Sequence, residues 1–329
     1  MAKDTIDDQL NAYLADAHSI EEQALAQLRT APDIAGREDL AAAFRQHLIE
    51  TQRHEALVRE RLEARGGTPS RFKKLVMEIG GKGFILFARS QPDTPGKLTA
   101  HAYSYEALEQ GAYEMLARMA HRAGDEETAA VARDILADEY AMADRLAQRF
   151  DSALEASLKD PDDPDATREQ LLSYLADAHA LENQSIGLLE HGQKIAGDPQ
   201  LAELYAAHLG QSRDQQRLVE ERLEALGGRP SRVKDAAMRL GALNWGGFFA
   251  AHPDTPAKLA VFAYAFEHLE IAGYELLGRV ARRAGDDVTA ELARRIAGEE
   301  RATAEAIRAA FDRALEVALA ELGLAHSAR

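Results

Sequence analysis

Four glutamates in the first half of the chain interrupt apolar positions that recur every three or four residues, the spacing of one face of a helix. Glu21, Glu109 and Glu139 lie on such apolar stripes, and Glu50 lies beside one. Burying an ionised carboxylate is strongly unfavourable unless its charge is compensated, and four converging carboxylates would also repel one another. Two divalent cations would neutralise them, so the pattern predicts a di-metal carboxylate site.

Two histidines lie one helical turn on either side of Glu50. His47 precedes it by three residues and His54 follows it by four, so Glu50 and His54 can reach a shared ion from the same helix face. Carboxylate and imidazole ligands together suit iron, with manganese as the alternative metal. The expected ligands are Glu21 and Glu139 as terminal carboxylates, Glu50 and Glu109 as bridging carboxylates, and His54 or His47 as the imidazole.

Long helices must position these side chains. Helix-favouring residues dominate, and glycines and prolines divide the first half into long segments at about 5–30, 37–65, 97–122 and 126–158, with a shorter one near 70–79. Strand patterns are absent. About thirty residues connect the second long segment to the third, which implies that these two helices run parallel. Four helices with one long crossover predict a ferritin-like bundle.

The second half of the chain repeats the first. Equivalent positions are 161 residues apart, as between His18 and His179, and no gap is needed from Gln9 to Leu158. Residues 159–165, KDPDDPD, are rich in proline and aspartate and predict a linker. We therefore expect an all-α protein of two tandem ferritin-like four-helix bundles, at 1–158 and 166–329, each with its long crossover.

The second repeat keeps part of the predicted site. Gln211 and Gln215 replace Glu50 and His54, and a neutral amide cannot supply the charge of a bridging carboxylate. We expect this degraded site to hold one metal weakly or none. The retained equivalents are Glu182, His208, Glu270 and Glu300.

Composition excludes several classes of protein. The 329 residues include 39 basic and 55 acidic residues, a net charge of −16 that opposes binding to nucleic acid or anionic membranes. There is no cysteine, so any metal must be held by oxygen and imidazole. No apolar stretch approaches the length of a membrane helix, and the start MAKDTIDDQL lacks the features of a signal peptide. We expect a cytoplasmic protein.

Short segments of both repeats resemble the YciE/YciF family of ferritin-like bacterial stress proteins. They are HLIET (His47 to Thr51), FEHLEIAGYE (Phe266 to Glu275) and GEERATAEAI (Gly298 to Ile307). The resemblance implies an all-helical bundle that dimerises, a di-iron site and a role in stress responses. The fused repeats would then form a pseudo-dimer within one chain. Assembly of several such chains into a homo-oligomer is a further alternative. Carried over by position, the resemblance supports Glu21, Glu50, Glu109 and Glu139, with His47 as a further candidate.

The sequence departs from the usual ferritin-like oxidase, which carries Glu-x-x-His on its second and fourth long helices. Here the second helix has Glu50-x-x-x-His54, and Asp138 and Tyr140 flank Glu139 where a histidine is absent. The favoured hypothesis is a metal site in repeat 1 that reacts with dioxygen or peroxide. The alternative is a non-enzymatic structural or interaction protein with vestigial polar cores. Iron storage in a ferritin-type cage fits least, because a fused pair does not readily give shell symmetry.

Overall fold

The computed structural model describes residues 5–68, 93–158, 163–231 and 255–324, and these residues form helices without any strand. The helices fall into two units, Met1–Ser157 and Leu158–Arg329. The all-helical fold class predicted from the sequence is thereby confirmed. The short helix expected near 70–79 and most of each crossover lie outside the described residues. Within the described residues, no helix is both long enough and apolar enough to cross a membrane.

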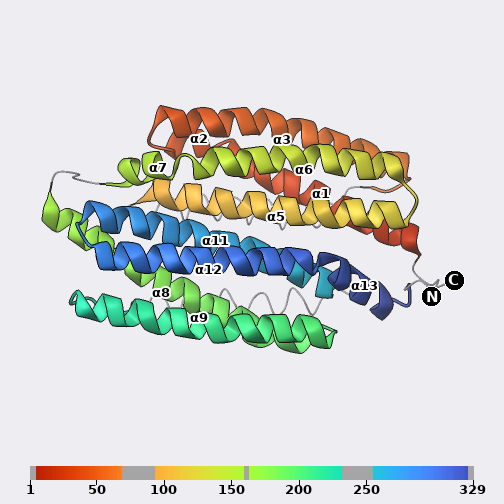
Figure 1. Cartoon of the computed structure of the whole chain (residues 1–329). Helices are drawn as coiled ribbons and strands as arrows, with labels where there is room; N and C mark the ends of the chain where they lie inside the picture. Colours follow the sequence, from red (N-terminus) through yellow and green to blue (C-terminus); the bar gives the residue numbers. More distant parts are fainter. Residues whose placement is uncertain (1–4, 69–92, 159–162, 232–254, 325–329) are drawn as a thin grey trace. The chain divides into compact units, whose positions relative to one another are not determined.

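The described residues of unit 1 form four long helices and two short ones (Figure 1). They are α1 (Ile6–Leu28), α2 (Ala31–Ile34), α3 (Glu38–Ala64), α5 (Thr94–Arg122), α6 (Glu126–Ala147) and α7 (Phe150–Ser157). In the ring of long helices, α1 packs on α3 and α5, and α6 packs on both α3 and α5. The helices α3 and α5 run in the same direction, as the length of the crossover predicted (Figure 1).

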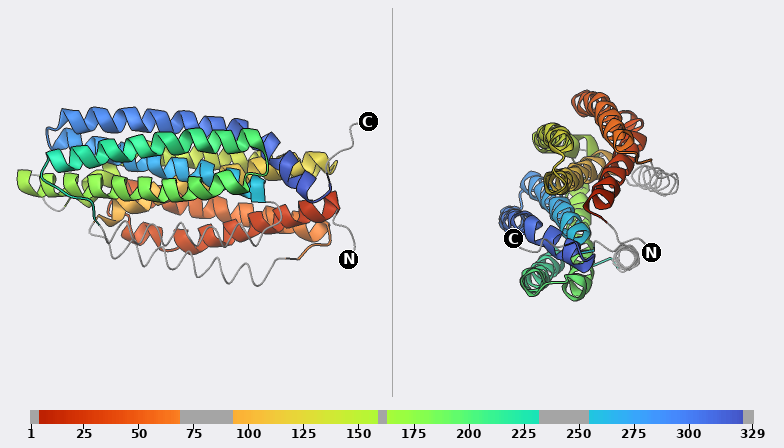
Figure 2. Two further views of the ribbon diagram at one scale, coloured as in Figure 1. Left: turned by 90° about the horizontal axis from the view of Figure 1, so that it is seen from below. Right: turned by 90° about the vertical axis from the view of Figure 1, so that its right-hand side faces the viewer.

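Unit 2 repeats this arrangement. Its helices are α8 (Pro164–Ile195), α9 (Pro199–Ala225), α11 (Thr255–Arg283), α12 (Asp287–Ala309) and α13 (Phe311–Glu321). The pairs α8 with α9, α11 with α12, α8 with α11 and α9 with α12 pack together, and Figure 2 shows the long helices of each unit both side-on and end-on. The helix α8 begins at Pro164, inside the linker expected at 159–165.

One predicted helix is divided in the structure. The segment expected at about 126–158 breaks after Ala147, and α7 begins at Phe150. The break lets Phe150 and Ala153 pack into the core of unit 1, and α7 lies against α5. No glycine or proline marks this break, because it is imposed by tertiary packing and not by local backbone preference.

The turn before α3 requires glycine for two reasons. Gly36 has a φ of +74°, and a β-carbon added there would lie 2.9 Å from Cγ of Pro95 and 3.1 Å from Cβ of Ala156. Gly66 has a φ of +75° but nothing within 4 Å of such a carbon. The two positions therefore share the backbone conformation and differ in the space around it.

Replacing each of these glycines by alanine separates the two effects. Gly66→Ala should cost roughly 1–2 kcal/mol from backbone strain at positive φ. Gly36→Ala should cost about 1–3 kcal/mol more, because the methyl group overpacks the contact of the α3 turn with Pro95 and Ala156. Chemical denaturation of both variants measures the difference. Equal losses would show that the Pro95 contact relaxes without cost.

Candidate metal centre

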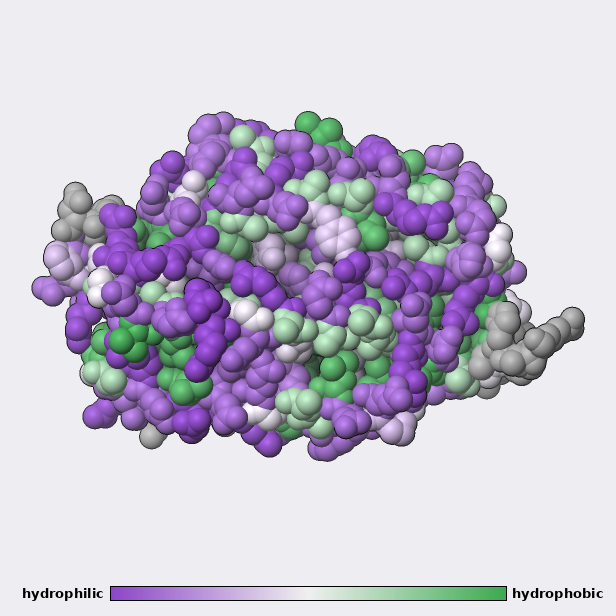
Figure 3. Space-filling model, viewed as in Figure 1, coloured by the Kyte–Doolittle hydropathy of each residue, from purple (hydrophilic) through white to green (hydrophobic). Residues whose placement is uncertain are grey.

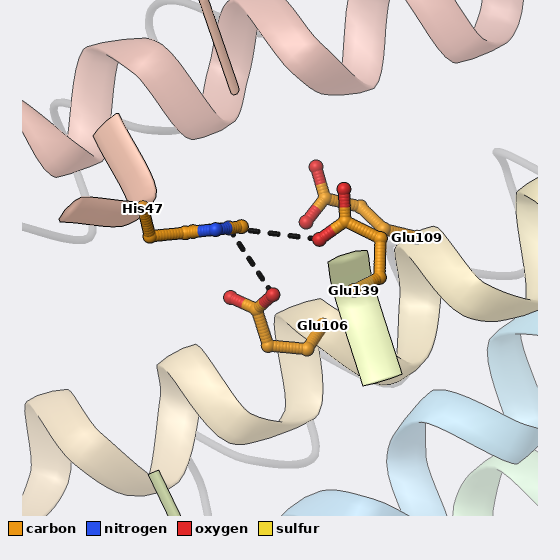
Figure 4. A group of neighbouring side chains, drawn as sticks. All are labelled: His47, Glu106, Glu109 and Glu139. Carbon is orange, nitrogen blue, oxygen red and sulfur yellow. Dashed lines mark ion pairs between the residues drawn. The ribbon is translucent and has the colours of Figure 1, made fainter. Parts of the chain in front are cut away.

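The centre of unit 1 holds a group of four buried side chains from three helices. Figure 4 shows His47 of α3, Glu106 and Glu109 of α5, and Glu139 of α6 converging on one another. One donor atom from each of the four lies within 4.8 Å of the others. The Nε2 atom of His47 is 3.2 Å from Oε2 of Glu106 and 3.6 Å from Oε2 of Glu139.

A second group adjoins the first and shares Glu139 with it. Glu21 of α1, His54 of α3 and Glu139 also present donor atoms within 4.8 Å of one another. Nδ1 of His54 lies 2.8 Å from Oε1 of Glu139 and 4.0 Å from Oε1 of Glu21. Glu139 thus turns one oxygen towards His54 and the other towards His47. This is the arrangement of a carboxylate that bridges two ion positions.

Each histidine is anchored by a carboxylate on the side away from this centre. Nδ1 of His47 contacts Oε2 of Glu50 at 3.1 Å, and Nε2 of His54 contacts Oδ2 of Asp138 at 3.1 Å. These outer carboxylates are themselves held by arginines, Glu50 by Arg145 and Asp138 by Arg53. Metal-binding histidines in proteins are usually oriented in this way, with the second ring nitrogen donating to a carboxylate.

The inner carboxyl groups are buried and resist ionisation. Burial, together with the charge of Glu139, raises the pKa of Glu21 to about 8, and burial raises the pKa of Glu139 to about 7. Burial and neighbouring carboxylates hold the pKa of Glu109 well above its usual range. Burial lowers the pKa of His54, but the hydrogen bond and charge of Glu139 outweigh it and raise that pKa to about 8.

Glu50 differs from these inner groups in its charge state. Burial would raise its pKa, but hydrogen bonds with His47 and Arg145 and the charge of Arg145 outweigh it and lower that pKa to about 2. Its carboxylate is therefore fully ionised and already compensated by a cation of the protein. A metal ion is not needed to explain its charge.

The inner carboxylates lack the partners that buried polar atoms normally have. Both oxygens of Glu109 and one oxygen of Glu21 have no hydrogen-bond partner within the part of the chain that the structure describes. The oxygens of Glu139 and one oxygen of Glu106 face the ring nitrogens of His47 and His54. The second oxygen of Glu21 accepts a hydrogen bond from the hydroxyl of Tyr113. Cations at the two groups would satisfy these oxygens and remove the repulsion among them, so the residues present fit a pair of metal ions.

Unit 2 reproduces the first group completely. His208 of α9, Glu267 and Glu270 of α11, and Glu300 of α12 are all buried, with donor atoms within 4.8 Å of one another. Nε2 of His208 is 3.0 Å from Oε1 of Glu267. Burial raises the pKa of Glu267 to about 8 and holds that of Glu270 well above its usual range. A buried His/Glu cluster that could hold a metal ion is therefore present in each half of the chain.

The second group of unit 2 is altered at one position. Glu182 stands where Glu21 does, and the hydroxyl of Tyr274 donates to it as that of Tyr113 does to Glu21. Gln215 replaces His54 and donates its amide nitrogen to Glu299 at 3.1 Å. Its amide oxygen is buried and has no hydrogen-bond partner among the described residues. Unit 2 thus offers a neutral oxygen where unit 1 offers an imidazole.

The structure brings together most, but not all, of the side chains singled out in the sequence. Glu50, expected as a bridging ligand, lies outside both groups and contacts Arg145 and His47 instead. Glu139, expected as a terminal ligand, occupies the position between the two histidines. The gathered predicted residues of unit 1 are Glu21, His47, His54, Glu109 and Glu139, and those of unit 2 are His208, Glu270 and Glu300, with Glu182 at the position equivalent to Glu21.

Sequence reasoning missed Glu106 and its equivalent Glu267. Each lies three residues before the glutamate that was predicted on the same helix, and three residues is one helical turn. With these two residues, each unit brings four buried carboxylates to the centre of its bundle, whereas four were expected in unit 1 and three in unit 2. The repetition of Glu-x-x-Glu in both halves, at Glu106–Glu109 and Glu267–Glu270, was the available signal.

Comparison with known proteins agrees with this duplication. The sequence profile of a family described as "Domain of unknown function (DUF892)" matches the chain twice, over residues 5–159 and 166–320. The two matches cover nearly the whole chain. No solved structure matches it.

Proposed function

Because the chain belongs to the DUF892 family of YciE/YciF-like ferritin-like proteins, as two domains in tandem, we propose that it binds transition-metal ions in both units and that unit 1 holds a pair of them. In unit 1, His47, Glu106 and Glu109 would hold one ion, and Glu21 and His54 the other. Glu139 would bridge the two. The observation that carries this proposal is the placement of the two Glu139 oxygens, one towards each histidine.

The donor set points to iron, with manganese as the alternative. Each position in unit 1 combines one imidazole with carboxylate oxygens and contains no sulfur ligand. Such sites suit Fe or Mn, whereas Zn and Cu sites favour more nitrogen or sulfur. The four carboxylates of unit 1 would balance the charge of two divalent cations, so the loaded centre would be close to neutral before the histidines are counted.

The proposed reaction is the reduction of dioxygen or peroxide in a stress response. When bound, a pair of redox-active ions supplies the electrons for such a reaction. The protein's own part is to fix the ligands: Tyr113 orients Glu21 through its hydroxyl, and Glu50 and Asp138 orient the two histidines. Glu21, Glu109 and Glu139 have no exposed surface, so the packed helices keep bulk water away from the centre.

Metal analysis of the protein purified without chelator tests the proposal. We expect iron or manganese in both units, and His54→Gln, which gives unit 1 the residue that unit 2 carries, should lose about one ion per chain because one imidazole ligand is removed. Glu60→Gln, at an exposed position of α3 outside the metal groups, is the control. Less than about half an equivalent of transition metal per chain would contradict the proposal, because buried sites of this kind normally retain their ions.

A further inference from the structure

The two units differ in how the seam between their second and fourth long helices is closed. In unit 1, Arg145 of α6 reaches across to Glu50 of α3, with Nη1 to Oε1 at 3.0 Å. Arg53 of α3 reaches the other way, to Asp138 of α6 at 2.9 Å and also to Asp134. Both ion pairs lie directly outside the histidines, because Glu50 contacts His47 and Asp138 contacts His54.

Unit 2 has lost both of these ion pairs. At the equivalent positions, Ala306 replaces Arg145, Gln211 replaces Glu50, and Asp214 replaces Arg53. Thr303 also replaces the buried Met142. No long cationic side chain of this set remains to cross from one helix to the other. The substitutions all remove either charge complementarity or side-chain bulk from the same seam.

A pocket of about 850 Å³ occupies this seam in unit 2. Its walls come from α9 and α12, and its lining includes His208 and Gln215, which are 3% and 1% exposed as whole residues. The buried amide oxygen of Gln215 has no hydrogen-bond partner within the described part of the chain. The seam lies on the face drawn in Figure 3, where hydrophobic side chains surface between α12 and α9. The pocket therefore leads from the surface to a ligand of the buried cluster.

We propose that this pocket is the access route by which a hydrated divalent cation enters and leaves the cluster of unit 2, and that the Arg145–Glu50 and Arg53–Asp138 ion pairs close the equivalent route in unit 1. The inference rests on the proposed metal binding and adds a difference in exchange between the two units. Unit 2 is the exchangeable site, and unit 1 is the one that retains its ions.

The charges along the route favour a cation. Its inner end is the group of buried glutamates around His208, and Asp214 stands at its outer part where unit 1 has a cation. Two arginines also line the pocket, but each pairs with a carboxylate on its own helix. Arg217 contacts Glu221 at 2.8 Å and Asp214 at 3.6 Å, and Arg295 contacts Glu299 at 3.7 Å. Neither spans the seam, so neither replaces the ion pairs of unit 1.

The rate at which the loaded protein releases metal tests the proposal. Full-length protein is loaded anaerobically with Fe²⁺, and release to a coloured ferrous chelator is followed by absorbance. We expect a fast phase from unit 2 and a slow phase from unit 1, differing by about tenfold or more, which corresponds to about 1.4 kcal/mol in the barrier. Glu109→Met, which removes a ligand of unit 1 only, assigns the phases.

Reciprocal substitutions then exchange the behaviour of the two units. Arg145→Ala should speed the slow phase towards the fast one, and Ala306→Arg combined with Gln211→Glu should slow the fast phase. Ala309→Arg, at an exposed position of α12 outside the pocket, is the control and should change neither. The unit 2 substitutions add side chains at the protein surface, so this arm is informative even if Arg145→Ala impairs folding.

Two contrary outcomes are distinguishable. A protein that loads iron in both units but releases it in a single phase, unaffected by either exchange of residues, overturns the access route and leaves the proposed metal binding intact. A protein that takes up no iron in either unit overturns the proposed function and this inference together.

Discussion

Replacing Glu109 by methionine is expected to stabilise the metal-free protein and to destabilise the metal-loaded one. Both carboxylate oxygens of Glu109 are buried without a hydrogen-bond partner among the described residues, and three other glutamates lie nearby. Methionine has a similar unbranched shape but no polar group that must be desolvated. Without metal, the substitution should add about 1–3 kcal/mol, the cost of leaving a buried polar group unsatisfied. For a unit of this size that is a rise of several degrees in Tm.

With metal, the sign of the same substitution reverses. Metal that binds only the folded state stabilises it, by about 4.1 kcal/mol at a concentration one thousand times the Kd. The Glu109→Met variant has lost a ligand of unit 1 and forfeits this gain there. Thermal melts of both proteins, each with chelator and with added Fe²⁺ or Mn²⁺, measure the two effects.

The exposed Glu60 of α3 provides the matched control. Glu60→Met removes the same charge from the surface of the same unit, and its Tm should respond to metal as the wild type does. If added metal leaves the wild-type Tm unchanged while Glu109→Met is stabilised under both conditions, the polar cores are vestigial. The non-enzymatic structural interpretation would then be the correct one.

The contrast between Glu109 and Glu50 also shows why sequence alone identifies only part of this site. Periodicity places Glu109 on an apolar stripe and Glu50 beside one, but it does not say which of the two meets a cation of the protein. On α3 the buried positions include His47, Thr51 and His54, so Glu50 is turned to the side of the helix that faces α6. There it meets Arg145, a residue 95 positions away along the chain. No local pattern reports such a long-range partner.

On α5, a member of the site lies outside the predicted apolar stripe. A single stripe does not include Glu106, whereas α5 contacts α1, α6 and α7 and is buried over a wide face. Residues one position off the predicted stripe, such as Glu106 and Gln110, are buried as well. A helix at the centre of several contacts buries more than one stripe, and the sequence does not say which helix that is.

Sequence patterns predicted the fold more completely than they predicted the metal ligands. Long runs of helix-forming residues between glycine and proline breaks predicted the long helices, and the length of the crossover predicted that α3 and α5 run parallel. The break between α6 and α7, its counterpart between α12 and α13, and the short helix α2 were not predicted. These features depend on local preferences and chain length, whereas ligand assignment depends on which side chains meet in three dimensions.

The metal-free protein is expected to lose stability as the pH rises from about 5 to 8. The folded-state pKa is about 8 for Glu21 and about 7 for Glu139, against an unfolded value of 4.5. Between these values the folded state binds more protons than the unfolded state, so the free energy of unfolding falls as the pH rises. His54 acts with the same sign, because its pKa is raised from 6.5 to about 8 and its proton is lost in the upper part of this range.

Each unit of pKa difference contributes about 1.4 kcal/mol per group at most, so the carboxyl groups together should lower the Tm by several degrees or more across this range. Glu50 does not contribute, because its folded pKa is about 2 and the stability that it provides is already complete above 4.5. Glu21→Gln should therefore flatten the profile of the metal-free protein, and Glu60→Gln, at an exposed position of α3, should leave its slope unchanged.

Bound metal should oppose this loss of stability with rising pH. Ions bind the deprotonated carboxylates and neutral imidazoles, so metal affinity increases with pH over the same range in which the metal-free protein weakens. The difference between the Tm values of loaded and metal-free protein should consequently widen steadily from pH 5 to pH 8. Melts at four or five pH values, with chelator and with added metal, measure it. A metal-free Tm that rises with pH would mean that the buried carboxyl groups ionise normally, and the physical reason for placing cations among them would be lost.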